Sequence, residues 1–204
     1  MSNSYTPEEP IAAIATALAP SALALIRISG KNCIELLSKV FSRPKALTQA
    51  EGNTIVYGWI VDSVNPDQKQ KIDEVLVSVF RAPKSYTGEE MAEISCHGGI
   101  SPVTAIFNLL LKNGFRTALP GEFTFRAFIN GKTDLTKSEA VKEIIDSKTD
   151  ASRSLAAGRL SGNLYNEIQS IKEKIISTIA SIEVELEYPE DEETIADAFD
   201  STEL

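Results

Sequence analysis

The chain has 204 residues, 43% of them hydrophobic, which suffices for one sizeable core with an appended helical piece. Ten of the acidic residues behind its net charge of −9 lie between Glu183 and Leu204, so the remaining body is nearly neutral and neither requires nor excludes an anionic partner. No apolar run is long enough for a membrane span, and the opening MSNSYTPEEP lacks the basic and apolar regions of a signal peptide, so we expect neither. Two cysteines with one histidine are too few for a disulfide framework or a typical Cys/His zinc site.

The first elements are two short buried strands. Residues 11–17 and 22–29 are rich in Ile, Leu and Ala, and Pro20 marks the break between them. Alternation along the second strand places Arg27 on the face of Leu23 and Leu25, opposite the more apolar face. This is an unusual setting for a guanidinium.

Further strands and helices follow up to residue 114. Apolar spacing predicts a helix from Ser29-Gly30 that ends at Arg43-Pro44. Two β-rich runs at 54–61 and 74–80 predict a wide hairpin with a polar loop over residues 62–71. A strand at 91–96 carries Glu93, and a helix capped by Ser101 is predicted to stop at Asn113-Gly114.

Residues 120–140 combine turn, helix, cap and charge signals. Pro120-Gly121 opens a turn, and an apolar segment follows that Asn130-Gly131 can end by taking a positive φ. Thr136 with Glu139 is typical of a capping box for the next helix. Lys132 is therefore expected in a short connection between two helices, where a polar side chain can face a ligand.

The remainder is predicted to be helical. A break is expected near 149–152, with Asp150 as the cap of the next helix. Apolar residues then recur at spacings of three and four from Leu160 to Leu186, a stripe that needs partners to cover it. An acidic linker is expected from Tyr188, and the open stripe favours further protein beyond this stretch.

Two motifs have simpler interpretations than their first appearance. Gly131-Lys132-Thr133 imitates the end of a phosphate-binding P-loop, but Arg126 stands where that loop requires a glycine, so we do not expect nucleotide binding there. Cys96-His97 imitates a thiol and base, but strand neighbours point to opposite faces, and no nearby carboxylate is clearly placed to orient the imidazole. No catalytic residue is assigned.

Three charges remain in apolar or constrained surroundings: Arg27, Glu93 and Lys132. An internal ion-pair network and a site for a small anionic ligand are both consistent with them.

Two segments in the same order resemble the family of tRNA-modification GTPases called MnmE or TrmE: residues 85–99 (SYTGEEMAEISCHGG) and 120–140 (PGEFTFRAFINGKTDLTKSEA). The openings IAAIAT at 11–16 and IRISG at 26–30 match as well, so the resemblance covers essentially the whole chain.

The resemblance implies an α+β fold: an N-terminal mixed sheet with packed helices over residues 1–130, similar to folate-binding aminomethyltransferases, followed by an incomplete helical bundle over residues 131–204. It implies a cytoplasmic homodimer that binds 5-formyltetrahydrofolate or a related one-carbon tetrahydrofolate through Arg27, Glu93 and Lys132. A flavin-dependent MnmG-type partner and tRNA, modified at its wobble uridine, are the implied partners. GTP, Mg²⁺ and K⁺ are implied only for the full-length family protein, because these 204 residues contain no P-loop pattern.

One departure leaves alternatives open. The family usually has a glycine-rich turn after its first strand, and residues 17–22 contain no glycine. A dimerisation scaffold without folate binding, or a free-standing folate-dependent transferase, are the alternative functions.

Overall fold

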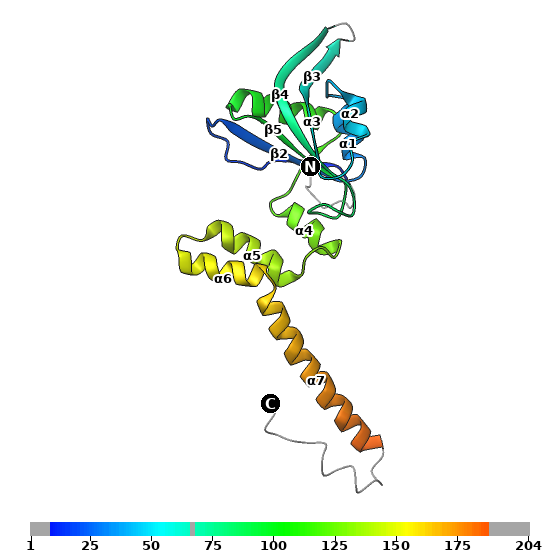
Figure 1. Cartoon of the computed structure of the whole chain (residues 1–204), viewed down its shortest axis with the longest axis vertical. Coiled ribbons are helices and arrows are strands. Elements are labelled where there is room, and N and C mark those ends of the chain that lie inside the picture. Colours follow the sequence, from blue (N-terminus) through cyan, green and yellow to red (C-terminus); the bar gives the residue numbers. More distant parts are fainter. Residues whose placement is uncertain (1–8, 66–67, 188–204) are drawn as a thin grey trace. The chain divides into compact units, whose positions relative to one another are not determined.

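The computed structural model describes residues 9–65 and 68–187, and it divides into a first compact unit that ends at Thr133 and a second that begins at Asp134 (Figure 1). The first unit is a six-stranded sheet with helices, and the second is helical. The predicted fold class is confirmed.

The sheet is mixed, with strand order β3-β4-β5-β2-β1-β6. All neighbouring pairs are antiparallel except β1 and β6, which are parallel. The strands are β1 (Ile11–Ile14), β2 (Leu23–Ser29), β3 (Thr54–Asn65), β4 (Gln68–Phe80), β5 (Met91–His97) and β6 (Arg116–Thr117).

One face of the sheet builds the core. Ala24, Ile26 and Ile28 of β2 are buried in it, together with residues of α1 (Cys33–Ser38), α2 (Pro44–Thr48) and α3 (Ile100–Lys112). The helix α3 contacts four of the strands. Leu23, Leu25 and Arg27 alternate to the other side, as predicted.

We call that other side the open face. Cross-strand partners define two rows across four strands: Ile55, Ser78, Glu93 and Arg27; and Tyr57, Leu76, Ser95 and Leu25. Beyond them, Trp59 lies opposite Glu74, and His97 lies opposite Leu23. Four of its apolar side chains, Leu23, Ile55, Tyr57 and Leu76, are between 47% and 66% exposed. The open face therefore carries an uncovered apolar strip, which shares Ile55 with the row of Arg27.

The predicted polar loop over residues 62–71 is wrong. The two strands continue through it, with Asp62 opposite Gln70 and Asn65 opposite Gln68. Backbone pairing in a two-stranded ribbon does not require apolar side chains. A prediction from the polarity of residues 62–71 therefore ends the two strands too early.

The helix predicted to run to Arg43 is also shorter than expected. It ends at Ser38, and Pro44 begins α2 instead of following the end of the first helix. Phe41 lies outside the helix and forms a backbone bridge with Ile60 of β3. A Cβ at Gly58 would lie 2.4 Å from the Phe41 ring, so the missing side chain of Gly58 is what admits the ring.

Helix ends differ from the predicted caps by one or two residues. Gly99, not Ser101, is the N-cap of α3, whereas Asn113 ends it as predicted. The helix α4 (Glu122–Ile129) stops at Asn130-Gly131, and it is Gly131 that takes the positive φ of 67°.

The second unit contains α5 (Leu135–Asp146), α6 (Asp150–Leu160) and α7 (Asn163–Glu187). The predicted Thr136–Glu139 box is wrong, because Asp134 is the N-cap of α5 and accepts a hydrogen bond from the backbone N of Lys137. Thr149 caps α6 with Ser152, where Asp150 had been predicted. A turn at Ser161-Gly162 separates Leu160 from the rest of the predicted stripe.

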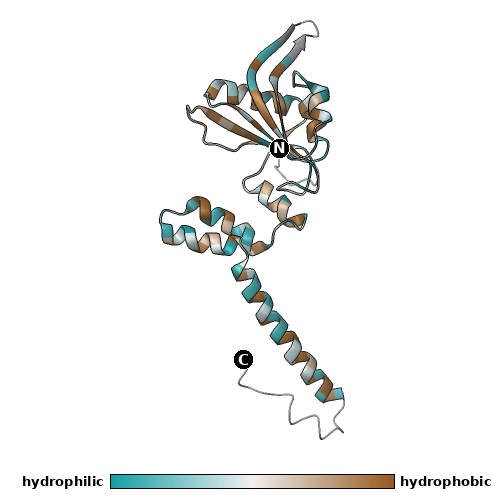
Figure 2. Cartoon of the chain, in the orientation of Figure 1, coloured by the Kyte–Doolittle hydropathy of each residue, from teal (hydrophilic) through white to brown (hydrophobic). Residues whose placement is uncertain are grey.

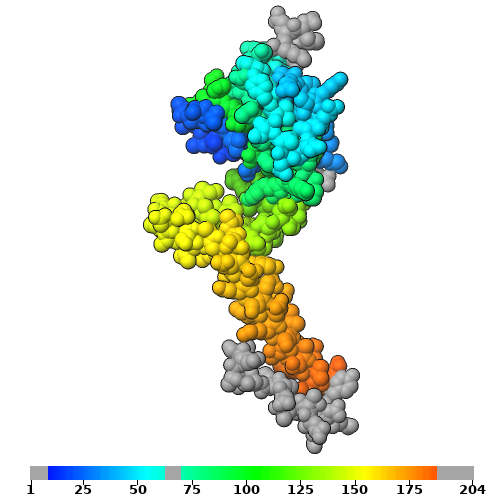
Figure 3. Space-filling view, in the orientation of Figure 1, coloured from blue at the N-terminus to red at the C-terminus, as the bar shows by residue number. Residues whose placement is uncertain are grey.

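The stripe on α7 is uncovered. No residue of α7 is buried within the described part of the chain, and apolar and polar bands alternate along it (Figure 2). Figure 3 shows the atoms of this helix, in orange, at the surface. None of the described helices is long and apolar enough to cross a membrane. The predicted acidic linker from Tyr188 onward lies outside the described residues.

The strands β4 and β5 separate at one end of the sheet. Their pairing runs from Phe80 opposite Met91 to Leu76 opposite Ser95, after which β4 continues with β3 and β5 with β2. Asp73 bridges the gap: its carboxylate accepts hydrogen bonds from the backbone N of His97 at 2.8 Å and from Nδ1 of His97 at 2.7 Å. These bonds and the charge of Asp73 raise the pKa of the imidazole above 6.5.

A buried charge network attaches α4 to the sheet. Arg126 is fully buried and donates to Glu122 at 2.9 Å, to Glu89 at 3.0 Å and to the carbonyl O of Glu9 at 2.9 Å. Burial raises the pKa of Glu122, but hydrogen bonds from Arg116, Leu119 N and Arg126 outweigh it and lower that pKa from 4.5 to about 2. The ionised carboxylate therefore stabilises the fold above pH 4.5, and this contribution is lost as the pH falls toward 2.

Replacing Arg126 by Met should lower the free energy of unfolding by about 3–5 kcal/mol, because it leaves the Glu89 carboxylate without its cation and leaves Glu122 with Arg116 as its remaining guanidinium partner. Urea titration followed by the fluorescence of Trp59, the single tryptophan, measures the loss in the first unit. Arg43→Met is the matched control at an exposed position of the same unit and should leave the midpoint nearly unchanged. Equal midpoints for the two variants would contradict the anchoring role of Arg126.

His97 is the only histidine, so its titration is directly visible by NMR. Its pKa should exceed 6.5, and Asp73→Asn should lower it, because the variant removes the negative charge that favours the imidazolium. The Asp73–His97 contribution to stability should be complete below pH 6.5 and decline as the pH rises through the raised pKa. An unchanged pKa in the variant would show that Asp73 does not hold the ring in solution.

Candidate functional site

Arg27 and Glu93 lie directly opposite each other on β2 and β5. Nε and Nη2 of Arg27 donate to the same carboxylate oxygen, Oε1 of Glu93, at 2.9 Å and 2.6 Å. The two side chains are 29% and 22% exposed, so the pair is reached by solvent. Within the described residues, Nη1 of Arg27 and Oε2 of Glu93 have no hydrogen-bond partner, which leaves a donor and an acceptor side by side.

Two aromatic rings lie beside this pair. The guanidinium carbon of Arg27 lies 5.4 Å from the centroid of the Tyr86 ring and 5.7 Å from that of Phe123. Tyr86 belongs to the loop between β4 and β5, and Phe123 to the first turn of α4. Both distances are within the range of cation–π attraction.

The loop over residues 83–90 and the helix α4 are joined along their length. The hydroxyls of Tyr86 and Thr124 are 2.9 Å apart, and Asn130 donates to the carbonyl O of Thr87 at 2.7 Å. Arg126 reaches Glu89 of the same loop. The loop is fixed to β2 as well, because the hydroxyls of Ser29 and Thr87 are 2.7 Å apart and buried.

Lys132 lies against the same loop but does not contact Arg27 or Glu93. Its Nζ donates to the carbonyl O of Pro83 at 3.0 Å. A Cβ at Gly88 would lie 3.2 Å from Cγ of Lys132, and Gly88 has a φ of 80°, so this glycine lets the lysine stem lie close to the loop. The structure thus joins two of the three predicted site residues directly and the third through the loop.

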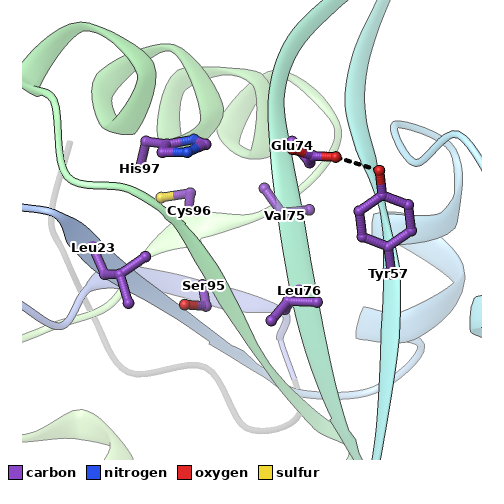
Figure 4. A pocket seen from close by; sticks show the side chains of 8 residues that line it. All are labelled: Leu23, Tyr57, Glu74, Val75, Leu76, Ser95, Cys96 and His97. Atoms are coloured by element: carbon purple, nitrogen blue, oxygen red, sulfur yellow. Dashed lines mark hydrogen bonds between the residues drawn. The ribbon is translucent and has the colours of Figure 1, made fainter.

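The structure forms a cavity at the separated end of β4 and β5 (Figure 4). It has a volume of about 290 Å³ and is lined by apolar residues at its centre and by polar groups that include Glu74, Ser95 and His97. Tyr57 donates its hydroxyl to Glu74 there. None of Arg27, Glu93 and Lys132 lines this cavity.

The prediction that no nearby carboxylate is placed to orient the imidazole of His97 is wrong, because Asp73 of β4 forms a hydrogen bond with Nδ1 of the ring. The expectation that Cys96 and His97 point to opposite sides is confirmed: Cys96 is buried, whereas the His97 side chain is 63% exposed. Burial raises the pKa of Cys96 to about 11, which makes its thiol a poor nucleophile at neutral pH. The Cys-His pair is therefore not a catalytic dyad.

The described residues contain no group of three or more His, Cys, Asp or Glu side chains that could hold a metal ion. Sequence reasoning missed Tyr86, Phe123, Arg126 and Asp73. A signal existed for Arg126, because Glu122 lies four residues before it and the intervening positions are apolar or small. No local signal existed for Asp73, whose partner lies on another strand.

Family comparisons agree with the two units. The family model described as the GTP-binding protein TrmE N-terminus matches residues 10–132, and the model of the MnmE helical domain matches residues 135–203.

Curated relatives with the name tRNA modification GTPase MnmE match nearly the whole chain. The protein of Treponema denticola is 56% identical over 195 residues, which is 96% of this chain and 41% of the relative. Those of Treponema pallidum and Borreliella burgdorferi are 45% and 46% identical over 200 residues, which is 98% of this chain and 39% and 42% of the relatives. The chain spans about two fifths of the length of these relatives, and it belongs to the MnmE (TrmE) family of tRNA-modification GTPases.

Proposed function

We propose that the first unit binds a tetrahydrofolate carrying a one-carbon unit, 5-formyltetrahydrofolate or a related form, through Arg27, Glu93 and Lys132. The observation that carries this proposal is the uncommitted donor and acceptor of the Arg27–Glu93 pair. The amino-pyrimidinone edge of a folate presents N–H donors next to a carbonyl oxygen. Oε2 of Glu93 can accept from those donors, and Nη1 of Arg27 can donate to that oxygen.

The surroundings fit such a ligand. Arg27 and Glu93 are partly exposed, so binding would not first require the separation of a fully buried ion pair. The exposed Lys132 ammonium has three donors, and one of them is bonded to the carbonyl O of Pro83. The remaining donors can bind a carbonyl or carboxylate oxygen of the ligand.

The bound folate would supply a one-carbon unit, and the residues of this unit would bind and orient it. We assign the chain to the N-terminal portion of a cytoplasmic tRNA-modification GTPase that acts on the wobble uridine with a flavin-dependent MnmG-type partner. The names of the relatives support the tRNA-modification part of this proposal. GTP, Mg²⁺ and K⁺ would bind parts of the family proteins that lie beyond the matched region.

A second candidate function, dimerisation, has its own supporting observation. The open face exposes Leu23, Ile55, Tyr57 and Leu76 as one apolar strip. Large exposed side chains grouped in this way are typical of protein–protein contacts. We propose that the first unit forms a homodimer through this strip, whether or not it binds folate.

Glu93→Gln should weaken the binding of 5-formyltetrahydrofolate at least about tenfold, because it removes the charged acceptor of two N–H bonds while keeping the side-chain size. Isothermal titration calorimetry measures the change. Glu51→Gln, an exposed position of the same unit, should bind like wild type. Tight binding that Glu93→Gln leaves unaltered would remove Glu93 from the site.

Leu76→Lys should shift the homodimer to monomer, because it places a hydrated charge at the centre of the apolar strip. Sedimentation velocity over a range of concentrations measures the shift. Leu18→Lys, which changes an exposed leucine outside the strip, is the control and should remain dimeric. A wild-type protein that stays monomeric at every concentration would refute the dimer.

A further inference from the structure

The two aromatic rings beside Arg27 come from elements that are distant in sequence. Tyr86 follows β4 and Phe123 begins α4, yet the guanidinium carbon of Arg27 lies 5.4 Å and 5.7 Å from their centroids. Tyr86 is 37% exposed and Phe123 is half-buried. Two partly exposed aromatic side chains thus lie beside the Arg27–Glu93 pair, which offers its free donor and acceptor at the same place.

The rings are held in place by bonds that do not involve Arg27. The Tyr86 hydroxyl is bonded to Thr124, the residue next to Phe123, at 2.9 Å. Asn130 and Arg126 attach α4 to Thr87 and Glu89 of the Tyr86 loop. The loop and the helix therefore present Tyr86 and Phe123 as one preorganised pair, and little side-chain entropy would be lost when a ligand binds.

The ion pair and the two aromatic rings together can recognise both the edge and the flat face of a ligand. Guanidinium and carboxylate groups form hydrogen bonds along the edge of a heterocycle, whereas aromatic rings attract its flat face. Stacking on an aromatic side chain favours planar, conjugated rings over puckered or aliphatic groups. An anionic ligand without a flat ring would use Arg27 alone and would gain nothing from Tyr86 or Phe123.

We propose that Tyr86 and Phe123 form an aromatic clamp that selects the flat aminopyrimidine ring of the ligand, and that Thr124 is a positioning residue that holds the Tyr86 ring. This inference rests on the proposed folate binding and adds the residues that determine ring specificity. The edge of the ring would meet Arg27 and Glu93, and its face would meet the clamp.

The clamp is tested by binding measurements with two probes, 5-formyltetrahydrofolate and the fluorescent heterocycle pterin. Phe123→Leu and Tyr86→Leu should each weaken the binding of both probes roughly three- to tenfold, because each substitution removes one aromatic ring for stacking. Phe128→Leu changes a partly exposed phenylalanine of the same helix and should bind like wild type. The unfolding midpoint of each variant, followed by Trp59 fluorescence, identifies any variant that has lost its fold.

The positioning role of Thr124 is tested by a double-mutant cycle. Tyr86→Phe and Thr124→Val remove the two ends of one hydroxyl bond but keep the ring and the shape of both side chains. Each should weaken pterin binding about twofold, and the double variant should be no weaker than either single one. Additive effects would overturn the positioning role.

The outcomes separate this inference from the proposed function. If wild type binds 5-formyltetrahydrofolate and both leucine variants bind it equally well, the clamp is refuted and folate binding stands. If wild type binds neither probe, both proposals fail. If wild type binds pterin alone and the leucine variants lose it, the clamp is supported, but its ligand is not a folate.

Discussion

The buried guanidinium of Arg126 is the contact on which the arrangement of the first unit depends. It links α4 to the carboxylate of Glu89, to the carboxylate of Glu122 and to the backbone at Glu9, where the chain enters the sheet. A helix of only eight residues has little stability of its own, so its position must come from such tertiary contacts. Phe123 and Lys132 lie at opposite ends of this helix segment, and a displaced α4 would move both away from the Tyr86 loop.

Alternation and apolar spacing predicted the elements that build the core. The strand at residues 22–29 and the place of Arg27 on its open side follow directly from the period of a strand, and the structure agrees. The β3–β4 hairpin was predicted, but its continuation through residues 62–71 was missed, because polar residues that pair through the backbone leave no hydrophobic signal. Phe41 was placed in a helix for the opposite reason: its apolar side chain fits a helical pattern, although Gly58 of a distant strand provides its actual contact.

The charged residues of the candidate site could be selected from sequence because each interrupts an apolar or constrained setting. Their partners could not be selected in this way. The Arg27–Glu93 pair depends on the register of β2 against β5, and the approach of Tyr86 and Phe123 depends on how a loop and a helix fold over that pair. Cap residues were mistaken by one or two positions because Ser, Thr and Asp all satisfy a helix N-terminus, and the backbone angles decide among them.

The bridge that Asp73 makes to His97 has a mechanical consequence. Beyond Leu76 the β4 strand no longer shares a backbone ladder with β5, so the Asp73 carboxylate joins β4 to β5 there, while backbone bonds with Val40 and Ser42 hold β3 from its other side. Where the backbone pairing stops, the spacing of β4 and β5 is set by this side-chain bridge and by the burial of Ile60 and Val75. The cavity lined by Glu74 and His97 lies at the place that a continued ladder would have closed.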